Sequence, residues 1–225
     1  MEAEDAVLDG DVQRFVRAMA PQPDETLREM DAYAEEADFP HVGPEVGGFL
    51  RLVARMVGAK RVFEFGSGYG YSAYWFAEAL PEDGELVLTE VDADELELAE
   101  TYLERGGYQD IARYELGDAM ETVGQYDGPF DVVLIDHQKH RYADAFEAIK
   151  PKLPVGGTII ADNAMRAGII DFDQLLEIAE GGSPADVNKH TQGIATYLET
   201  VRADPDFETV VLPLGEGIAL SYRIS

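Results

Sequence analysis

The sequence RVFEFGSGYGYSAYWFAEAL, residues 61–80, sets the architecture expected for the whole chain. It opens with an apolar run that suits a β-strand buried on both faces. Three glycines at alternate positions follow, and apolar residues then recur at helical spacing from Ser72 to Leu80. We predict a strand, a tight glycine turn and a helix. Such a turn leaves backbone N–H groups and the positive end of the helix dipole facing a ligand, which suits a nucleotide-like molecule.

The glycine spacing and one acidic residue narrow the choice of nucleotide. Gly66, Gly68 and Gly70 form GxGxG, whereas the dinucleotide fingerprint has its third glycine one residue later, at Tyr71 here, which counts against NAD. Glu64 lies inside the predicted buried strand, where a carboxylate is costly unless it has a partner. The ammonium and sulfonium groups of S-adenosylmethionine would provide that partner. The alternative is an acid held by backbone N–H groups at the end of the strand.

Length and composition point to one globular α/β domain. A chain of 225 residues can bury a substantial core in a single domain. The absence of cysteine excludes disulfides and thiolate metal sites. The first residues lack the basic start and apolar core of a signal peptide, and no stretch approaches the length of a membrane span. We therefore expect a cytoplasmic protein with no membrane partner.

The charge balance is strongly acidic. The 45 acidic residues outnumber the 17 basic ones and give a formal net charge of −28. This charge repels phosphates, so nucleic acids and anionic membranes are poor partners. It also destabilises the compact state at low salt. A salt-rich cytoplasm would screen the repulsion, and we therefore predict a halophilic source.

The residues before the 61–80 stretch predict helices rather than strands. Pro44 suits the first position of the last of these helices, and Gly58 suits its end. We expect residues 1–57 to form a helical cap on a core of residues 58–225 within a single domain. The three predicted helices span residues 12–19, 25–36 and 45–57.

The core alternates strands and helices, which is typical of a doubly wound α/β sheet. A turn at residues 215–217 joins the last two strands and predicts an antiparallel hairpin. Ser183 and Pro184 predict the N-cap and first residue of a long helix before this hairpin. We predict a Rossmann-like, mostly parallel, seven-stranded sheet with helices on both faces. The predicted strands span 62–65, 85–89, 112–116, 130–135, 158–161, 207–212 and 218–224, and the other helices span 72–80, 93–106, 119–124, 143–149 and 172–179.

Acidic residues follow several predicted strands, at the edge where ligands bind in open α/β sheets. Glu90 ends the second strand, and its two carboxylate oxygens suit the two hydroxyls of a ribose. Asp118 follows the third strand and has two interpretations. It either accepts from an adenine amino group or caps the helix that follows it.

Two further strand ends predict a metal site. Asp136 follows one apolar strand, and Asp162 and Asn163 follow the next. These side chains supply hard oxygen ligands, which favour Mg²⁺, or Ca²⁺ or Mn²⁺, over zinc. An Asp-Asn pair alone is a common turn and helix-cap signal, but together with Asp136 and a nearby lysine it favours a metal. His137 and His140 fit packing or hydrogen bonding better than metal ligation.

Three segments in order carry a family resemblance: 64–72 (EFGSGYGYS), 135–142 (IDHQKHRY) and 161–163 (ADN). With the acid at Glu90, they resemble the class I S-adenosylmethionine-dependent methyltransferases. More narrowly, they resemble the metal-dependent catechol and caffeoyl-CoA O-methyltransferase family. The likeness runs roughly from Val42 to the C terminus. It implies a magnesium-dependent O-methyltransferase acting on a small, catechol-like vicinal diol, and the caffeoyl-CoA relatives suggest a homodimer.

The resemblance implies a role for each matching residue. Asp136, Asp162 and Asn163 would bind magnesium, and Lys139 would be the general base that deprotonates the acceptor. A lysine simply paired with Asp136 is the alternative. The residues implied to contact S-adenosylmethionine are Val42, Glu64, Gly66, Ser67, Gly68, Tyr71, Ser72, Glu90, Val91, Gly117, Asp118, Ala119, Asp136 and His137.

The chain departs from the catechol enzymes in two respects. Gln138 stands where they have a tryptophan, and no counterpart is evident for the late glutamate that receives a substrate hydroxyl in the animal enzymes. Catechol itself is therefore not implied as the acceptor. A metal-independent methyltransferase and a non-catalytic cofactor-binding protein are the alternative functions. We expect the N-terminal helices and an insertion at residues 166–183 to wall the acceptor pocket, and their apolar residues could form a dimer face.

The predicted halophilic character has a direct test. We expect the melting temperature to fall as salt is withdrawn, because the repulsion among the excess carboxylates is then no longer screened. Thermal unfolding followed by circular dichroism over a KCl series measures this dependence. A melting temperature that does not change with salt would instead indicate an acidic protein of an ordinary cytoplasm.

Overall fold

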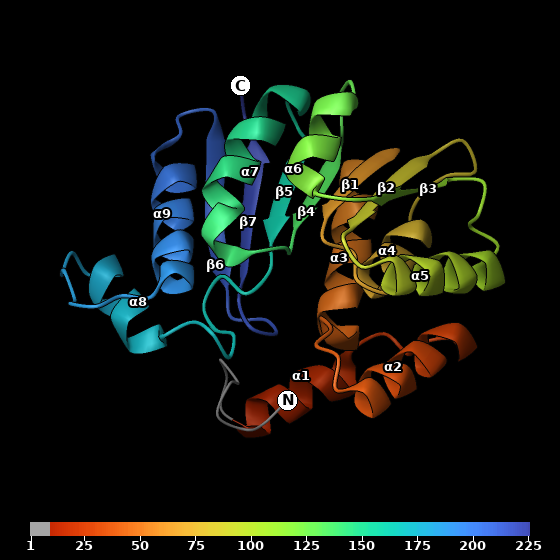
Figure 1. The fold of residues 1–225 in the computed structure, drawn as a ribbon, viewed down its shortest axis with the longest axis horizontal. Helices are drawn as coiled ribbons and strands as arrows, with labels where there is room; N and C mark the ends of the chain where they lie inside the picture. Colours follow the sequence, from red (N-terminus) through yellow and green to blue (C-terminus); the bar gives the residue numbers. More distant parts are fainter. Residues whose placement is uncertain (1–9) are drawn as a thin grey trace.

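Strand β1 (Arg61–Phe65) lies near the centre of a seven-stranded sheet in the computed structural model, which describes residues 10–225. The strand order is β3-β2-β1-β4-β5-β7-β6. The first five strands are parallel, and β7 pairs antiparallel with both β5 and β6. The predicted Rossmann-like sheet with a C-terminal hairpin is confirmed (Figure 1). The other strands are β2 (Glu85–Glu90), β3 (Ala112–Leu116), β4 (Val132–Ile135), β5 (Thr158–Ala161), β6 (Phe207–Leu212) and β7 (Ile218–Arg223).

The strand register brings three strand ends into line. Phe65 of β1 pairs with Ile135 of β4, and Ile135 pairs with Ala161 of β5. The residues that follow, Asp136 and Asp162, continue this alignment. The Asp136 N–H donates to the Phe65 carbonyl at 2.9 Å, and the Asp162 N–H donates to the Ile135 carbonyl at 3.2 Å. The predicted site residues on β4 and β5 are therefore neighbours at one edge.

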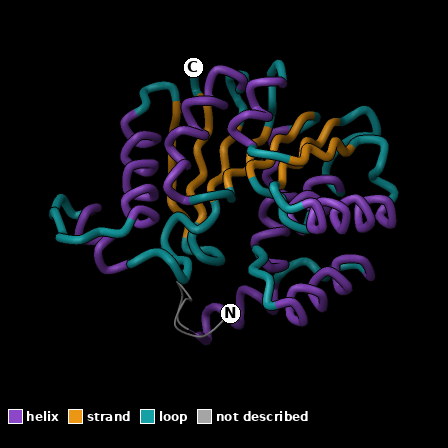
Figure 2. The backbone as a smooth tube through the Cα atoms, viewed as in Figure 1, coloured by secondary structure: helices purple, strands orange, loops and turns teal. Residues whose placement is uncertain are grey.

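Helices cover both faces of the sheet, and each face has its own apolar core (Figures 1 and 2). One core joins the sheet to the helices that precede and follow β1 and to α5. The other joins it to α6, α7, α8 and α9. The first set of helices comprises α3 (Gly43–Val57), α4 (Tyr71–Ala77) and α5 (Ala93–Gly106), and the second comprises α6 (Ala119–Thr122), α7 (Tyr142–Ile149), α8 (Phe172–Ala179) and α9 (Lys189–Ala203).

Two N-terminal helices extend the first layer. Helix α2 (Glu25–Ala37) begins at Asp24, whose side chain accepts from the Leu27 N–H and also receives the Tyr74 hydroxyl of α4 at 2.7 Å. Helix α1 (Gly10–Met19) has no buried residue. It lies on the side toward which β5 points, which is the carboxyl edge of the sheet (Figure 1). The first nine residues of the predicted cap lie outside the described part of the chain.

The prediction that Ser183 and Pro184 begin the long helix is wrong. Helix α9 begins at Lys189, because the Asn188 side chain accepts from the N–H groups of His190 and Thr191 and so caps it. Residues 183 and 184 belong to the preceding loop. The Ser-Pro signal competed with a stronger cap five residues later.

Smaller differences occur at element ends. Helix α4 stops at Ala77, so its predicted last turn, up to Leu80, is not α-helical. Strand β4 starts at Val132, because the Phe130 N–H donates to the Lys152 carbonyl instead of a neighbouring strand. The helix predicted for 119–124 divides into α6 and a 3₁₀ turn. The 3₁₀ turns are Val123–Gln125, Lys139–Arg141 and Lys150–Lys152.

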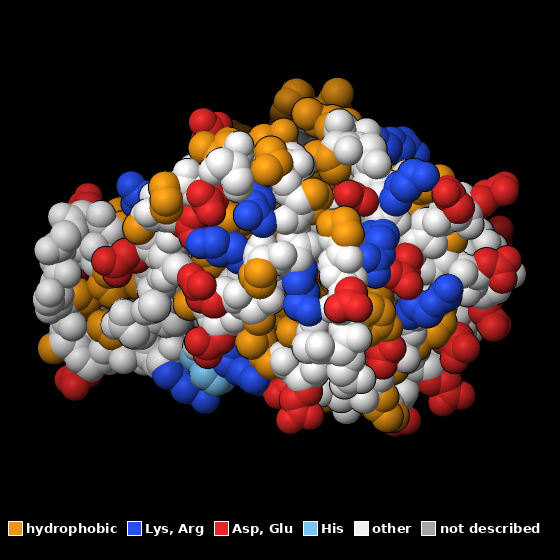
Figure 3. All heavy atoms as spheres, turned by 90° about the horizontal axis from the view of Figure 1, so that it is seen from above, with side chains coloured by type: hydrophobic (Ala, Val, Ile, Leu, Met, Phe, Trp, Pro, Cys, Tyr) orange, Lys and Arg blue, Asp and Glu red, His pale blue; other side chains and the backbone are white. Residues whose placement is uncertain are grey.

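Acidic side chains crowd one end of the molecule. Seen from above, Asp and Glu concentrate at the end where β3 and α5 lie, whereas Lys and Arg are interspersed with acids over the middle (Figure 3). Helix α5 alone contributes Asp94, Glu95, Glu97, Glu100 and Glu104. Within residues 10–225, no helix combines the length and the apolar character needed to cross a membrane.

Candidate active site

The predicted glycine turn between β1 and α4 has a left-handed backbone. Gly66, Gly68 and Gly70 have φ values of 84°, 49° and 86°. A Cβ on Gly66 would lie 2.8 Å from the carbonyl oxygen of Asp136, so only glycine allows β1 and β4 to end this close together. Glu90 fixes the other side of the turn, since its carboxylate accepts from the Gly68 N–H at 2.9 Å. The predicted cofactor residues of β1 and β2 are therefore joined.

Glu64 is fully buried beside this turn. Neither of its carboxylate oxygens has a hydrogen-bond partner of normal geometry within residues 10–225. Burial raises the pKa of Glu64 to about 8, the Ser72 hydroxyl opposes the shift, and the charge of Asp136 adds to it. The alternative of backbone N–H groups holding this acid is not observed. A buried carboxylate without a partner fits a cationic ligand group.

The ends of β4 and β5 form a compact polar cluster. Lys139 is buried, and its Nζ donates to Asp136 Oδ1 at 2.7 Å and to the Tyr142 hydroxyl at 2.9 Å. Asp162 is also buried, and its Oδ1 has no hydrogen-bond partner in the described chain. Burial raises the pKa of Asp162, and the nearby charge of Asp136 raises it further. The two carboxylates therefore lie near each other beside one lysine, and one of them, Asp162, has an oxygen without a partner in the described chain.

Asn163 completes the predicted oxygen set. Its backbone is left-handed, with φ of 54°, a conformation that asparagine tolerates better than most residues. Its side-chain Nδ2 donates to Glu216 in the turn between β6 and β7. Among residues 10–225, no three His, Cys, Asp or Glu side chains gather as a metal site. The candidate centre thus depends on the amide of Asn163 as its third ligand.

Asp118, one of the residues predicted to contact adenine, has an ion-pair partner that the sequence analysis did not predict. Asp118 caps α6 by accepting from the Met120 N–H at 2.9 Å, as one of its two interpretations required. Its other oxygen receives Arg141 Nη1 at 2.8 Å, and this guanidinium lowers the pKa of Asp118. The preceding Gly117 has φ of 145°, and its N–H donates to the Glu90 carbonyl at 2.8 Å. The adenine role of Asp118 and of the buried Ala119 stays a prediction.

His137 packs as an aromatic residue, as predicted. Its ring stacks on Tyr142 with a centroid separation of 5.6 Å and an interplanar angle of 5°, and it lies 5.5 Å from the Phe65 ring. Burial lowers the pKa of His137 to about 4, so the ring is neutral at pH 7. Neither ring nitrogen has a hydrogen-bond partner among the described residues. Of the other predicted contacts, Val91 is exposed, whereas Ser67 and Tyr71 are buried.

The segment before α3 contacts α4 and α2 through His41. Val42 immediately precedes α3, and the His41 ring packs edge-on against Tyr71 at 4.7 Å. His41 Nε2 lies 3.1 Å from an Asp31 oxygen. This contact joins α2 to the segment that carries Val42.

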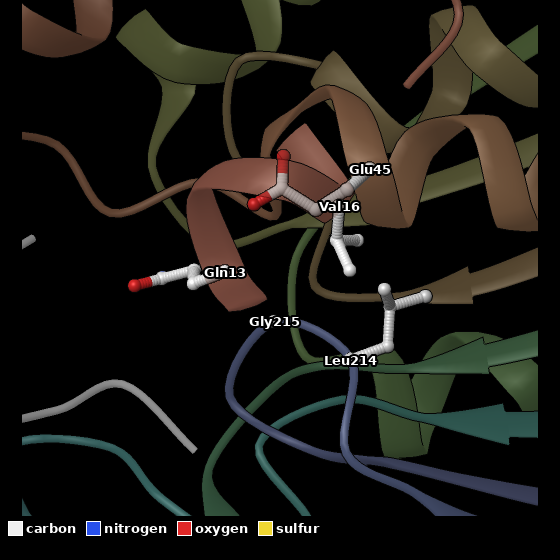
Figure 4. A pocket seen from close by; sticks show the side chains of 5 residues that line it. All are labelled: Gln13, Val16, Glu45, Leu214 and Gly215. Carbon is white, nitrogen blue, oxygen red and sulfur yellow. The ribbon is translucent and has the colours of Figure 1, made fainter. Parts of the chain in front are cut away.

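A small cavity of about 10 Å³ lies where α1, α3 and the β6–β7 turn meet. Figure 4 shows Gln13 and Val16 of α1, Glu45 of α3, and Leu214 and Gly215 of the turn around it. Glu45 is buried and lies 3.5 Å from Arg17 Nε. Helix α1 is therefore next to the turn that carries Glu216.

Comparison with known proteins identifies the family of the chain. The model of the O-methyltransferase family matches residues 20–224. A catechol O-methyltransferase of Niastella koreensis is 31% identical over 200 residues, covering 84% of this chain and 90% of that protein. Caffeoyl-CoA O-methyltransferase 2 of Petunia hybrida is 27% identical, covering 91% of this chain and 85% of that protein.

A solved structure shows the same fold with cofactor present. The O-methyltransferase TomG of Streptomyces achromogenes, involved in tomaymycin synthesis and solved in complex with S-adenosylmethionine, superposes with a TM-score of 0.83. It is 25% identical, and the match covers 100% of both chains. The chain belongs to the O-methyltransferase family and is an S-adenosylmethionine-dependent enzyme of the catechol and caffeoyl-CoA type.

Proposed function

We propose that this enzyme needs a divalent metal, preferably Mg²⁺, and methylates one hydroxyl of a small aromatic acceptor with two vicinal oxygens. The observation that carries the proposal is the cluster at the ends of β4 and β5. Asp162 has a buried oxygen with no partner there, Asp136 lies close enough to raise its pKa, and Asn163 is adjacent. These oxygen donors fit magnesium, or Ca²⁺ or Mn²⁺. The names of the catechol and caffeoyl-CoA relatives support an aromatic acceptor.

We propose that the glycine turn and its neighbours hold S-adenosylmethionine. Glu64 would face the cationic methionine end of the cofactor with Ser72, and Glu90 would receive the ribose hydroxyls. Glu90 Oε2 accepts from the Gly68 N–H, and Oε1 accepts from the N–H groups of Val91 and Asp92. One ribose hydroxyl would therefore use the remaining lone pair of Oε2, and the second would replace one of the donors to Oε1. Residues 10–57 would cap the acceptor side of the 58–225 core within a single domain, and the position of α1 supports this arrangement.

The chemistry assigned to the chain is one proton transfer and one methyl transfer. When bound, magnesium would lower the pKa of an acceptor hydroxyl and orient it. Lys139 Nζ, in its neutral form, would take the proton of that hydroxyl, and the resulting oxyanion would attack the methyl carbon as the bond to sulfur breaks. Asp136 and Tyr142 hold Nζ in place by hydrogen bonds of 2.7 and 2.9 Å. Positioning of donor and acceptor would supply much of the rate enhancement.

A metal-independent methyltransferase is the second candidate. The ion pair between Lys139 and Asp136 favours it, because this pair balances the Asp136 carboxylate without a metal. In that case Asp162 and Asn163 would only shape the turn after β5.

A chelator separates the two candidates. We expect treatment with EDTA to lower methylation of a catechol panel at least about tenfold, and added Mg²⁺ or Mn²⁺ to restore it. Methyl transfer from labelled S-adenosylmethionine measures the rate, and the calcium-loaded chelator serves as control. Unchanged activity after chelation would support the metal-independent enzyme and exclude our proposal.

The base assignment predicts the behaviour of Lys139→Met. We expect kcat to fall about a hundredfold or more, because no other group takes the proton, while the affinity for S-adenosylhomocysteine is unchanged. Lys189→Met, at an exposed position at the start of α9, is the matched control. Single-turnover kinetics and calorimetric titration measure the two properties. Full activity in Lys139→Met would contradict the base assignment and would show that Lys139 only pairs with Asp136.

The cofactor assignment predicts opposite effects of Glu64→Gln on binding and on stability. We expect at least about tenfold weaker binding of S-adenosylhomocysteine, because the ligand ammonium loses its charged partner. The pKa of Glu64 is about 8 in the folded protein, above the usual value of 4.5. Glu64 therefore lowers folding stability progressively as pH rises from about 4.5 to about 8, and the variant should melt higher than wild type at pH 8.

The exposed Glu82→Gln serves as the control for Glu64→Gln, because it removes a carboxylate far from the turn. Calorimetry and thermal unfolding without ligand measure the two effects. A Glu64→Gln protein that binds like wild type would show that this acid does not face the cofactor.

We also propose a homodimer in a salt-rich cytoplasm. A groove of about 480 Å³ lies at the amino end of the sheet, between α3 and β7. Met56 and Val155 on its rim are 76% and 65% exposed, and Tyr222 is 45% exposed, so a second copy would cover apolar surface there.

Light scattering tests the dimer. The wild-type protein should have twice the 24.7 kDa mass of the chain, and Met56→Glu should have the mass of a single chain, because the charge disfavours burial of this surface. A wild-type monomer in high salt would refute the dimer.

A further inference from the structure

The turn between β6 and β7 is fastened to the loop that carries Asn163. The Ala164 N–H donates to the Gly217 carbonyl at 2.8 Å, and the Met165 and Arg166 N–H groups donate to the Glu216 carbonyl at 3.3 and 2.8 Å. Gly217 has φ of 98°, and a Cβ there would lie 2.4 Å from Met165 Cγ. The close approach requires glycine at this position. The backbone of Glu216 is therefore held against the end of β5.

Packing from the opposite side also restrains this turn. A Cβ on Gly215 would lie 2.7 Å from Val46 Cγ2 of α3, so the turn lies directly on that helix. Leu214 and Gly215 face Val16 and Glu45 across the small cavity (Figure 4). The Glu216 side chain thus starts from a backbone that is supported on two sides.

The Glu216 carboxylate determines which end of the Asn163 amide is available. Asn163 Nδ2 donates to Glu216 Oε2. An ionised carboxylate only accepts hydrogen bonds, so the amide must present its NH₂ group to Glu216. The amide oxygen then remains as the atom that a cation can use. Without Glu216, the amide could rotate and present its NH₂ group, which cannot bind a cation.

We infer that Glu216 is a positioning residue for the metal centre, which it serves by orienting the Asn163 amide. This inference rests on the proposed metal dependence. It assigns a role to a residue that lies 53 positions from Asn163 in the sequence and that the motifs of β4 and β5 do not include. Residues that orient metal ligands in this way typically contribute ten- to a hundredfold to metal affinity.

Binding of Mn²⁺ tests the inference without an activity assay. Electron paramagnetic resonance of free Mn²⁺ gives the Kd for wild type and variants in the presence of S-adenosylhomocysteine. We expect Glu216→Ala to bind Mn²⁺ about ten- to a hundredfold more weakly. Glu216→Gln keeps an acceptor oxygen for Nδ2 and should recover most of that loss. Glu208→Ala removes the same charge from an exposed position of β6 and should bind like wild type.

A double-mutant cycle isolates the route through Asn163. In the Asn163→Ala background, Glu216→Ala should cause no further loss of Mn²⁺ affinity, because the amide it orients is gone. Thermal unfolding of each variant checks that the fold persists, and if Glu216→Ala does not fold, Glu216→Gln and Glu216→Ser replace it.

The Mn²⁺ affinities distinguish failure of the role inferred for Glu216 from failure of the proposed metal dependence. Glu216→Ala with wild-type Mn²⁺ affinity overturns the inference, and so does Glu216→Gln that binds as weakly as Glu216→Ala, since charge alone would then account for the effect. Wild-type protein that does not bind Mn²⁺ overturns the proposed metal dependence instead, so the two failures are distinguishable.

Discussion

The parallel pairing of β1, β4 and β5 determines where Glu64, Asp136 and Asp162 lie relative to one another. Phe65, Ile135 and Ala161 are in register, so the residues after them leave the sheet at one level. A shift of one residue in either pairing would turn Asp136 or Asp162 to the opposite face. The apolar cores on both faces of the sheet enforce this register, because a slipped strand would expose its buried side chains. The chemistry at the edge is therefore a consequence of packing within the sheet.

This edge concentrates carboxyl groups at a cost to the folded protein. Glu64 and Asp162 are buried carboxylates with unpaired oxygens, and Asp136 raises the pKa of both. Lys139 offsets part of this charge through Asp136. Polar groups held without partners in the free protein are a common property of binding sites, where ligands supply the missing interactions. The cationic cofactor and the proposed divalent metal carry the positive charge that would complement these carboxylates.

Local signals in the sequence were sufficient to predict the sheet and most of the strand-end residues. The β1 glycine turn, the apolar runs of β4 and β5, and the acids that follow them are each encoded within a few residues. Long-range contacts were not predictable in this way. Arg141 reaches Asp118, and Glu216 reaches Asn163, only because the fold brings distant segments together. The start of α9 was not predicted because two cap signals, at Ser183 and Asn188, lie close in the sequence, and only the Asn188 side chain accepts the N–H groups of the first turn.

The contact between Gly66 and Asp136 couples the glycine turn after β1 to the end of β4. Gly66 has no side chain, so the turn lies against the Asp136 carbonyl. The Asp136 N–H donates a hydrogen bond to the carbonyl of Phe65, the residue before Gly66. A methyl donor that displaces the turn would displace Asp136 with it. If the turn holds the methyl donor and Asp136 helps to hold the acceptor, as proposed, both tasks share one mechanical support, and substitution of Gly66 by any larger residue would disturb both at once.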